Sequence, residues 1–479
     1  FDSNEAAADA LAGMLQRKGL RQVSGDIILD ARAFSGPDYP DGWTKDDPWY
    51  CYGMKTGALS IAENCLIITA KGASKAGNTP TVTPDPPLHP SLFVNKVKTV
   101  SRGKSSIKIK QAANGVVTVT GQVRAGRSAE KEYPVPHPDL LFGSALAAGM
   151  QRVGIGFQGK IVRAADWQGG AVQWTQIASV GSPQMMHILG VMLKHSDNFI
   201  AEMLTRAIGM QHGSGGTTAA GAQVVGQILQ GAGIASQGTF KIYDGSGLSR
   251  NNRLTPRVLM QLFRTFYNSY MGPALMTALA EPGQPGTLKK RMAGTDAESN
   301  IKAKTGALRG VCSLSGYFTR ENGHTGAFVM FMNGYSVHSS NIRAIQDNPI
   351  GVFDSGIGGL SLLRELDSLM PYEDYIYVGD TACMPYGTRS EKDIVDRSEQ
   401  IIRFLEKKKC KMIVIACNTI SGLLPEITRR EKHDTPVVGI INYGCVTAAL
   451  YVTYNFRLGV LATRRTVNSG VYREVIDNF

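Results

Sequence analysis

Residues 301–319, IKAKTGALRGVCSLSGYFT, decide the fold of the central part of the chain. The runs IKAKTGAL (301–308) and VCSLSGYFT (311–319) have the composition of β-strands and are bounded by turn residues. A third run, TGAFVMFMNGY (325–335), follows RENGH (320–324), in which the Asn-Gly pair favours a hairpin. The three runs predict an antiparallel sheet.

The segments before this sheet fall into three patterns. Residues 5–19 predict an amphipathic helix, and GDIILDARAF (25–34) predicts a strand. From about Thr79 the sequence predicts first Pro-rich turns, TPTVTPDPPLHP (79–90), and then half-buried antiparallel strands in SSIKIKQ (105–111) and NGVVTVTGQV (114–123). Helical spacing dominates from about Asp139 to Gly272, as in LLFGSALAAGMQRVG (140–154) and SPQMMHILGVMLKH (182–195).

A different pattern begins at Pro349. IGVF, YIYVG, KMIVIA, PVVGII and LGVLAT are short apolar runs, and each is followed by a helical or loop segment. Parallel strands buried on both faces have this appearance. The chain is therefore predicted to be multidomain, α/β and α+β, with domains at 1–137, 138–347 and 348–479.

Composition and charge limit the classes of function. The chain has 479 residues, 43% hydrophobic and 19% charged, which is typical of a soluble globular protein of roughly three domains. No apolar run reaches the roughly 18 residues of a membrane span. Residues 346–479 carry 16 Lys+Arg and 17 Asp+Glu, a net charge of −1. Residues 1–345 carry 35 Lys+Arg and 22 Asp+Glu, a net charge of +13, so the basic character of the chain belongs to them.

Much of this positive charge lies in residues 96–131, a stretch with almost no aromatic residues. Nucleic-acid binding is therefore disfavoured, and a solvated sheet face near an anionic cell-surface polymer is favoured. The seven cysteines include no C-x-x-C pair and no Cys/His cluster at zinc spacing, so neither a metal site nor a disulfide scaffold is expected. No cofactor is predicted.

The first candidate site combines two short motifs. Ser196, Asp197 and Asn198 lie between two helical patterns, where a polar triplet alone is usually only a helix N-cap.

The second motif is K-T-G, at the end of an apolar strand, and consists of Lys304, Thr305 and Gly306. In this place a Lys can point into a cleft and a Gly leaves room for a substrate backbone. Alone this motif is equally weak, because Lys55-Thr56-Gly57 repeats it by chance. S-x-N followed by K-T-G on a strand is the signature of serine acyl-transferases that act on D-alanyl peptides and penicillins.

With these motifs, residues 1–345 resemble the penicillin-binding proteins of the D-alanyl-D-alanine carboxypeptidase/endopeptidase family. LKHSDNFIAEML, YDGSGLSRNNRLTP and KAKTGALRGVCSLSGYF are similar to its characteristic blocks, and GDIILDARAF and GALSIAENC to its inserted region. The resemblance implies helices on an antiparallel sheet with an inserted β-rich domain. It also implies that Ser196 and Asn198 relay protons and hold the peptide amide, while Lys304 and Thr305 bind the terminal carboxylate.

The nucleophile of that family, the Ser of an S-x-x-K motif, is expected to lie outside this sequence. Four S-x-x-K strings occur, starting at Ser101, Ser105, Ser128 and Ser299. The first three fall in the basic β-patterned stretch and the fourth runs into the K-T-G strand. None opens a buried helix, so all four are interpreted as chance matches.

The second candidate site lies in residues 349–479. IGVFDSGIGGLSLLREL predicts a strand, a Gly-rich loop and a helix, which would direct backbone N–H groups at an anion; a dinucleotide site is disfavoured because Ser361 replaces the third glycine of G-x-G-x-x-G. Cys417 follows the strand KMIVIA, at the edge where such sheets bind ligands, although a lone Cys is more often a core residue.

Together with GDTACMPYGTRS and LGVLATRRTVNSGVY, these blocks resemble glutamate racemase. The resemblance implies a partial parallel α/β domain and cofactor-independent proton exchange at the α-carbon of glutamate, with Cys417 as one of two thiol acid/bases. Asp354, Ser355, Tyr386, Gly387, Asn418 and Thr419 would hold the substrate, and Cys383, Cys410 and Cys445 would be structural. The second thiol, in a G-C-T-H block, has no counterpart, so half of that site is expected to be missing.

Both resemblances imply peptidoglycan metabolism, with stem peptides, β-lactams and glutamate as ligands. The alternative is a non-catalytic protein that only binds peptidoglycan. A carboxypeptidase would work outside the cytoplasm and a racemase inside it. The sequence therefore predicts a conflict of compartment, and a fusion of two incomplete coding regions.

Overall fold

The computed structural model describes residues 4–169, 173–295, 297–319, 323–370, 373–447 and 462–477. The chain forms two compact units, Phe1–Ala280 and Glu281–Phe479. Each unit is described by itself below, and the domain boundaries expected after residues 137 and 347 remain predictions. No helix in the described part of the chain is long and apolar enough to cross a bilayer.

The first unit begins with a helix that packs on a later one. α1 (Asn4–Arg17) contacts α2 (Pro138–Arg152), and Ala12, Met150 and Ile155 are buried between them and the adjoining strands. Two short parallel ladders join the same parts of the chain, β1 (Gln22–Val23) with β9 (Gly156–Phe157) and β2 (Ile27–Leu29) with β10 (Ile161–Arg163). The segment between β2 and α2 is therefore an insertion into the region formed by α1, α2 and these two ladders.

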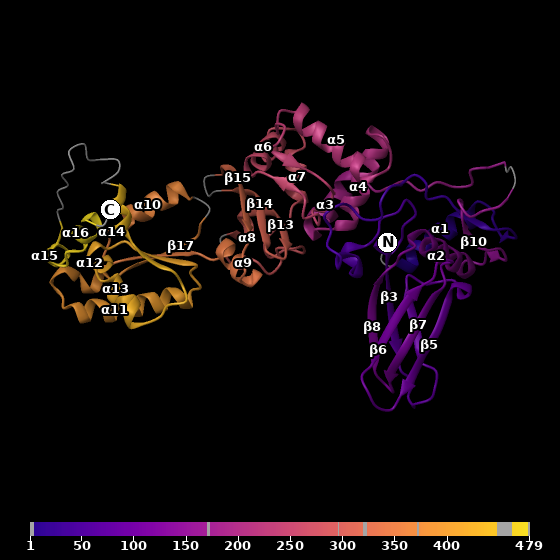
Figure 1. Ribbon diagram of the computed structural model, residues 1–479, viewed down its shortest axis with the longest axis horizontal. Helices are drawn as coiled ribbons and strands as arrows, with labels where there is room; N and C mark the ends of the chain where they lie inside the picture. The colour runs from indigo at the N-terminus through magenta and orange to yellow at the C-terminus, as the bar shows by residue number, and fades with distance from the viewer. Residues whose placement is uncertain are drawn as a thin grey trace. The chain divides into compact units, whose positions relative to one another are not determined.

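The insertion holds two three-stranded sheets that share one core (Figure 1). One sheet has the order β4-β3-β8, from β3 (Cys65–Lys71), β4 (Thr81–Asp85) and β8 (Ser128–Pro134). The other has the order β5-β7-β6, from β5 (Phe93–Val100), β6 (Ser106–Gln111) and β7 (Val117–Arg124). β6 and β7 are antiparallel as predicted, whereas β5 and β7 are parallel. Alternate residues such as Ile68, Ile107 and Val119 fill the core.

One expectation for this region was wrong. Residues 79–90 were expected to form Pro-rich turns, but 81–85 form β4, which pairs antiparallel with β3. β4 is an edge strand of its sheet, and Pro84 is tolerated there because an edge strand has one row of N–H groups without a ladder partner.

Helices make up the rest of the first unit. They are α3 (Met185–His195), α4 (Asn198–His212), α5 (Thr218–Gly231), α6 (Pro256–Tyr267) and α7 (Gly272–Ala278), with a short antiparallel pair, β11 (Phe240–Lys241) and β12 (Arg253–Leu254). α4 packs closely on α5, and Leu229, Ile234 and Val258 form a small core beside them. The predicted helical region is confirmed.

The second unit contains the predicted antiparallel sheet. β13 (Ile301–Leu308), β14 (Val311–Thr319) and β15 (Thr325–Asn333) pair in sequence order, and α8 (Ala297–Asn300) and α9 (Ser339–Asp347) flank them in the chain. The expected hairpin residues 320–322 lie outside the described part. Only Asn348 and Pro349 separate α9 from the next strand.

The predicted parallel sheet follows directly (Figure 1). Its order is β17-β16-β18-β19, from β16 (Ile350–Asp354), β17 (Tyr375–Gly379), β18 (Met412–Ile415) and β19 (Val437–Gly439). The helices are α10 (Leu360–Leu369), α11 (Glu391–Lys407), α12 (Asn418–Ser421), α13 (Leu424–Arg430), α14 (Ile440–Thr447), α15 (Arg464–Asn468) and α16 (Val471–Asp477). All β16 residues are buried, as its apolar sequence predicts. Of the expected strand LGVLAT, residues 458–461 lie outside the described part.

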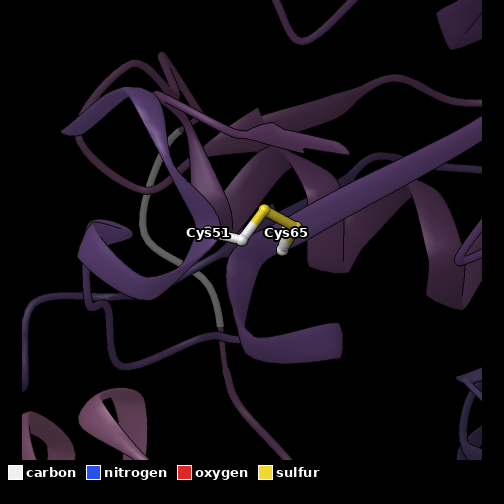
Figure 2. Close-up of a disulfide and its surroundings, with 2 residues drawn as sticks. All are labelled: Cys51 and Cys65. Carbon is white, nitrogen blue, oxygen red and sulfur yellow. A yellow bond between two sulfur atoms is a disulfide. The ribbon is translucent and has the colours of Figure 1, made fainter. Parts of the chain in front are cut away.

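A disulfide joins Cys51 to Cys65 in the first unit (Figure 2). It closes a loop of 14 residues and ties the turn Cys51–Gly53 to the start of β3. The sparse cysteines thus form one local bridge, although no disulfide scaffold was expected. Glu132 is near both sulfurs, but thiols joined in a disulfide cannot ligate a metal.

Candidate functional site

The S-D-N motif lies at the junction of α3 and α4. Ser196 ends α3 with φ 59° and ψ 49°, a left-handed conformation that is unfavourable for a residue with a side chain. The Asp197 carboxylate caps α4 by accepting from the Ile200 N–H at 2.8 Å, so the capping interpretation holds for this residue. Asn198 Nδ2 donates to the Tyr52 carbonyl at 2.9 Å. The junction therefore constrains the Ser196 backbone and lies beside the disulfide-bonded turn.

Buried acids anchor the segments around this junction. Glu202 on α4 accepts from the backbone N–H groups of Gly245 and Ser246, at 2.9 and 2.8 Å, and its burial raises its pKa. Asp244 accepts from Trp43 Nε1 and from the Ser249 N–H. The block YDGSGLSRNNRLTP is thus a turn fixed against α4. Burial also raises the pKa of Glu63, and the charge of Asp197 adds to this effect.

The K-T-G motif lies on β13 in the second unit. Lys304 Nζ donates to the Thr305 carbonyl at 2.6 Å, and burial lowers the Lys304 pKa to about 8. A Cβ added at Gly306 would lie 2.4 Å from Ser313 Oγ on the paired strand β14. That oxygen can move by rotation of the Ser313 side chain, whose Cβ would be 3.7 Å away, so packing within the sheet does not by itself require glycine here. The S-D-N motif belongs to the first unit and the K-T-G motif to the second, so each is described by itself.

The chance copy of K-T-G has a different environment. Lys55 pairs with Asp38 at 2.6 Å, and Lys55, Thr56 and Gly57 lie in a loop rather than on a strand. The copy at residues 304–306 lies on a strand, as the sequence predicts, and the copy at residues 55–57 does not.

The four S-x-x-K strings lack the setting of a nucleophile. Lys104, Lys108 and Lys131 are exposed, and Lys302 pairs with Glu281 at 3.2 Å. Ser105 Oγ accepts from the backbone N–H of Arg124 at 3.0 Å, in the loop before β6. An exposed or ion-paired lysine is poorly placed to take a proton from serine. These features support the interpretation of chance matches.

The thiol site lies at the carboxyl ends of two adjacent strands. β16 and β18 pair in parallel with Phe353 opposite Ile415, which confirms the predicted adjacency of IGVF and KMIVIA. Ser355 Oγ, just after β16, lies 3.4 Å from the sulfur of Cys417, just after β18. Cys417 is 7% exposed and precedes the first turn of α12.

Asp354 is fixed by the loop that follows it. Its carboxylate is buried and accepts from the Gly359 N–H at 2.9 Å, at the start of α10. A Cβ at Gly359 would lie 2.8 Å from Ala416 Cβ and 2.9 Å from Asp354 Cβ. The second glycine of the Gly-Gly pair therefore allows the two strand ends to approach.

The other predicted substrate-binding residues are held by protein contacts. Asn418 Oδ1 accepts from Tyr472 Oη at 2.8 Å, and Thr419 Oγ1 lies 3.3 Å from Thr463 Oγ1. A Cβ at Gly387 would be 3.0 Å from Thr463 Cβ. Tyr386 is buried, and its hydroxyl donates to Asp380 Oδ2 at 2.6 Å, so this hydroxyl is already engaged. Their roles toward a substrate remain predictions.

Sequence reasoning missed three residues of this site. Thr463 and Tyr472 belong to the block LGVLATRRTVNSGVY. This block indicates the family, but it does not indicate that these two residues contact Thr419 and Asn418. Tyr377, on β17, donates to the Gly356 carbonyl at 2.7 Å, and burial raises its pKa. An aromatic residue on an apolar strand carries no sequence signal of such a role.

The remaining cysteines of the second unit's parallel-sheet region differ from one another. Burial raises the pKa of Cys410 to about 11 and also raises that of Cys445, as fits structural residues. Cys383 is half-buried and accepts a hydrogen bond from Arg397 Nη1 at 2.7 Å. Cys383 thus has a polar contact in addition to packing.

Two family models match the chain. Residues 3–353 match the D-Ala-D-Ala carboxypeptidase 3 (S13) family, and residues 350–479 match the Asp/Glu/Hydantoin racemase family. The crystal structure of penicillin binding protein 4 from Haemophilus influenzae is 26% identical with a TM-score of 0.57, covering 70% of this chain and 74% of that chain. A second structure of that protein is a complex with a β-lactam.

Curated relatives match the second region. Glutamate racemase of Thermoanaerobacter pseudethanolicus is 44% identical over 132 residues, which are 28% of this chain and 48% of the relative. Glutamate racemase of Neisseria meningitidis is 46% identical over 131 residues, 27% of this chain and 48% of the relative. The chain spans about half the length of these racemases. It belongs to the D-Ala-D-Ala carboxypeptidase 3 (S13) family, fused to an Asp/Glu racemase-type domain at residues 350–479.

Proposed function

We propose that this chain acts on peptidoglycan as a serine-type D-alanyl-D-alanine carboxypeptidase/endopeptidase. The observation that carries the proposal is the occurrence, within one S13 family match, of Ser196 in a constrained helix junction and of Lys304, half-buried on an antiparallel strand. Lys304 and Thr305 bind the terminal carboxylate of the stem peptide. Asn198 holds the peptide amide and Ser196 relays protons to it.

Binding is tested with a soluble acyl-D-alanyl-D-alanine peptide and isothermal titration. We expect the Lys304→Ala chain to lose at least tenfold in affinity, because a half-buried cation proposed to face the carboxylate is removed. Lys289→Ala, which removes an exposed lysine of the same unit, is the control and should bind as the unchanged chain does. Equal affinities for all three chains would contradict the carboxylate role of Lys304.

Catalysis is separated from binding by a fluorescent penicillin. The described S-x-x-K lysines are exposed or ion-paired, so we expect no stable acyl-enzyme from the 479-residue chain. Stoichiometric labelling at Ser101, Ser105, Ser128 or Ser299 would overturn this expectation. Peptide binding without labelling would favour the second candidate, a protein that binds peptidoglycan without cleaving it.

For residues 350–479 we infer proton exchange at the α-carbon of glutamate. The 3.4 Å contact between Ser355 Oγ and Cys417 Sγ, beside the buried carboxylate of Asp354, supports it. The Cys417 thiolate removes the α-proton, which leaves a carbanion on glutamate and a thiol on Cys417, and a proton returned from that thiol restores the amino acid. Asp354, Ser355, Asn418 and Thr419 hold the ammonium and carboxylate groups, together with the backbone at Tyr386 and Gly387.

The test uses glutamate in D₂O, followed by mass spectrometry and chiral chromatography. No G-C-T-H block supplies a second thiol in the sequence, so we expect deuterium in one enantiomer without interconversion of the two. Cys417→Ser should abolish the exchange, whereas Cys410→Ser, at a buried thiol with a raised pKa, should leave it unchanged. Measurable racemisation would refute the half-site proposal.

The proposal includes the cellular compartment in which the chain works. The Cys51–Cys65 disulfide supports an oxidising, extracytoplasmic location for the carboxypeptidase region. A thiol acid/base at Cys417 and a cytoplasmic substrate favour the opposite side of the membrane. We propose that the carboxypeptidase region determines where the chain works.

A further inference from the structure

The sheet β5-β7-β6 has a strongly basic outer face. Lys96 and Lys98 on β5 and Lys108 and Lys110 on β6 are all exposed. The register places Lys96, Thr120 and Lys108 in one row across the sheet, with Thr120 on the central strand β7. We call these four lysines and Thr120 the lysine face.

Alternation in the strands fixes this arrangement. Val97 on β5, Ile107 and Ile109 on β6 and Val119 on β7 point into the core and are buried, so their sequence neighbours point outward. Burial of the apolar side chains therefore holds the lysines on a rigid surface. None of the four lysines takes part in an ion pair found within the described ranges.

Charge is distributed unequally between the two sheets. Strands β5, β6 and β7 contain no Asp or Glu. The outer face of the other sheet carries Asp85, Glu130 and Glu132, opposite outward-facing residues of β3, and one lysine, Lys71. The positive potential is therefore concentrated on one side of the insertion, and an anionic partner is attracted to the lysine face.

The spacing of the lysines fits a linear polyanion. Lysines two residues apart on one strand are about 7 Å apart, and the two lysine-bearing strands are about 10 Å apart across β7. An anionic chain lying along β7 meets positive charge on both sides and the hydroxyl of Thr120 below it. A single small anion reaches only part of this face.

The composition of the face distinguishes between classes of polymer. The three strands carry no Trp or Tyr, and their one Phe, Phe93, is at the beginning of β5, away from the lysines. Single-stranded nucleic acids are bound by stacking of bases on aromatic side chains, which this face does not offer. A carboxylate-bearing polymer needs only positive charge and hydrogen-bond donors.

We propose that the lysine face binds intact peptidoglycan strands through the carboxylates of their stem peptides. The identity of the polymer rests on the proposed function of the chain. Each exposed lysine–carboxylate contact contributes only about 0.2–1 kcal/mol, so binding requires several repeating carboxylates at once. The insertion then retains the chain on the polymer while the peptide-binding motifs act on individual stem peptides.

The test is co-sedimentation of the full chain with purified insoluble peptidoglycan at about 50 mM salt, where surface charges are weakly screened. The variant K96Q/K98Q/K108Q/K110Q should bind at least tenfold more weakly. The matched control K18Q/K392Q/K407Q/K432Q removes the same charge at other exposed positions and should stay within twofold of the unchanged chain. Equal losses in both variants would overturn the proposal, because net charge alone would then explain binding.

Two further arms use the unchanged chain, so they do not depend on the folding of a variant. Peptidoglycan whose carboxylates have been converted to amides should no longer bind, and binding that survives this treatment contradicts the proposal. Tighter binding to phosphatidylglycerol vesicles or to single-stranded DNA also contradicts it.

Failure of the proposed function gives a different result. If the soluble D-alanyl peptide does not bind but peptidoglycan still sediments the chain through the lysine face, the carboxypeptidase proposal fails and this one stands. If the peptide binds equally to both quadruple variants and neither variant loses sedimentation, only the lysine-face proposal fails.

Discussion

The lowered pKa of Lys304 predicts that the affinity for a D-alanyl peptide depends on pH. Its burial lowers its pKa from 10.5 to about 8, so the ammonium is present at pH 7 and is lost as the pH rises through 8. If Lys304 binds the terminal carboxylate, affinity for a D-alanyl peptide should be constant below pH 7. It should then fall roughly tenfold for each pH unit above 8. Titration calorimetry between pH 6 and 10 measures this profile.

The control keeps the charge and removes the titration. Lys304→Arg carries a guanidinium that stays protonated throughout this range, so its affinity, though lower at neutral pH, should not change between pH 7 and 10. A decline above pH 8 that persists in Lys304→Arg would assign the titration to another group.

Single residues also show where sequence reasoning reaches its limit. The contact of Ser355 with Cys417 follows from two strands ending at the same sheet edge, which the apolar runs 350–353 and 411–416 predict. The contacts of Thr463 with Thr419, and of Tyr472 with Asn418, join segments more than 40 residues apart through helices that the sequence places only approximately. No local pattern encodes such contacts.

At the scale of elements, strongly apolar or regularly alternating runs were predictable and unusual local chemistry was not. Fully buried β16 and alternating β6 and β7 appear where the sequence predicts them. The sequence does not reveal β4, because Pro84 is a turn signal in a Pro-rich run, whereas an edge strand tolerates proline. The disulfide was missed because pairing depends on the distance between Cys51 and Cys65 in space, which is 5.5 Å between Cα atoms.

Two glycines provide a matched test of how the strand ends approach. Gly359→Ala places a Cβ within 3 Å of Ala416 Cβ and Asp354 Cβ, so we expect a loss of about 1–3 kcal/mol in unfolding free energy. Gly444→Ala, inside α14 with no atom within 4 Å of the new Cβ, should stabilise by about 0.5–1 kcal/mol. Urea unfolding followed by circular dichroism measures both changes.

Tryptophan fluorescence supplies the internal control for this pair. All four tryptophans, Trp43, Trp49, Trp167 and Trp174, belong to the first unit. Their transition should be the same in both variants, because the substitutions lie in the second unit. A destabilised fluorescence transition in Gly359→Ala, or no difference between the two variants by circular dichroism, would contradict the role assigned to Gly359.

At the scale of the whole molecule, the regions that match the two families are joined by two residues, Asn348 and Pro349, between α9 and β16. Such a short connection leaves little freedom for the parallel sheet to move away from the antiparallel sheet before it. The carboxypeptidase family match extends to residue 353, through β16 up to Phe353, so the two matched regions overlap rather than being separated by a linker.

Whether the S-D-N and K-T-G motifs act on one ligand can be tested by a double-mutant cycle. Asn198 and Lys304 are both proposed to hold the same D-alanyl peptide. Residues that contact one ligand in one site are coupled, typically by 0.5–3 kcal/mol, whereas distant sites without a shared partner add to within about 0.3–0.5 kcal/mol. We therefore expect the affinity loss of Asn198→Ala/Lys304→Ala to differ from the sum of the two single losses by at least 0.5 kcal/mol.

The control is a second cycle. The losses of Asn198→Ala and Cys410→Ser, a change at a buried thiol of the parallel sheet, should be additive. Additivity in both cycles would mean that the S-D-N and K-T-G motifs do not act on one ligand, and it would remove the basis for the carboxypeptidase activity proposed for this chain.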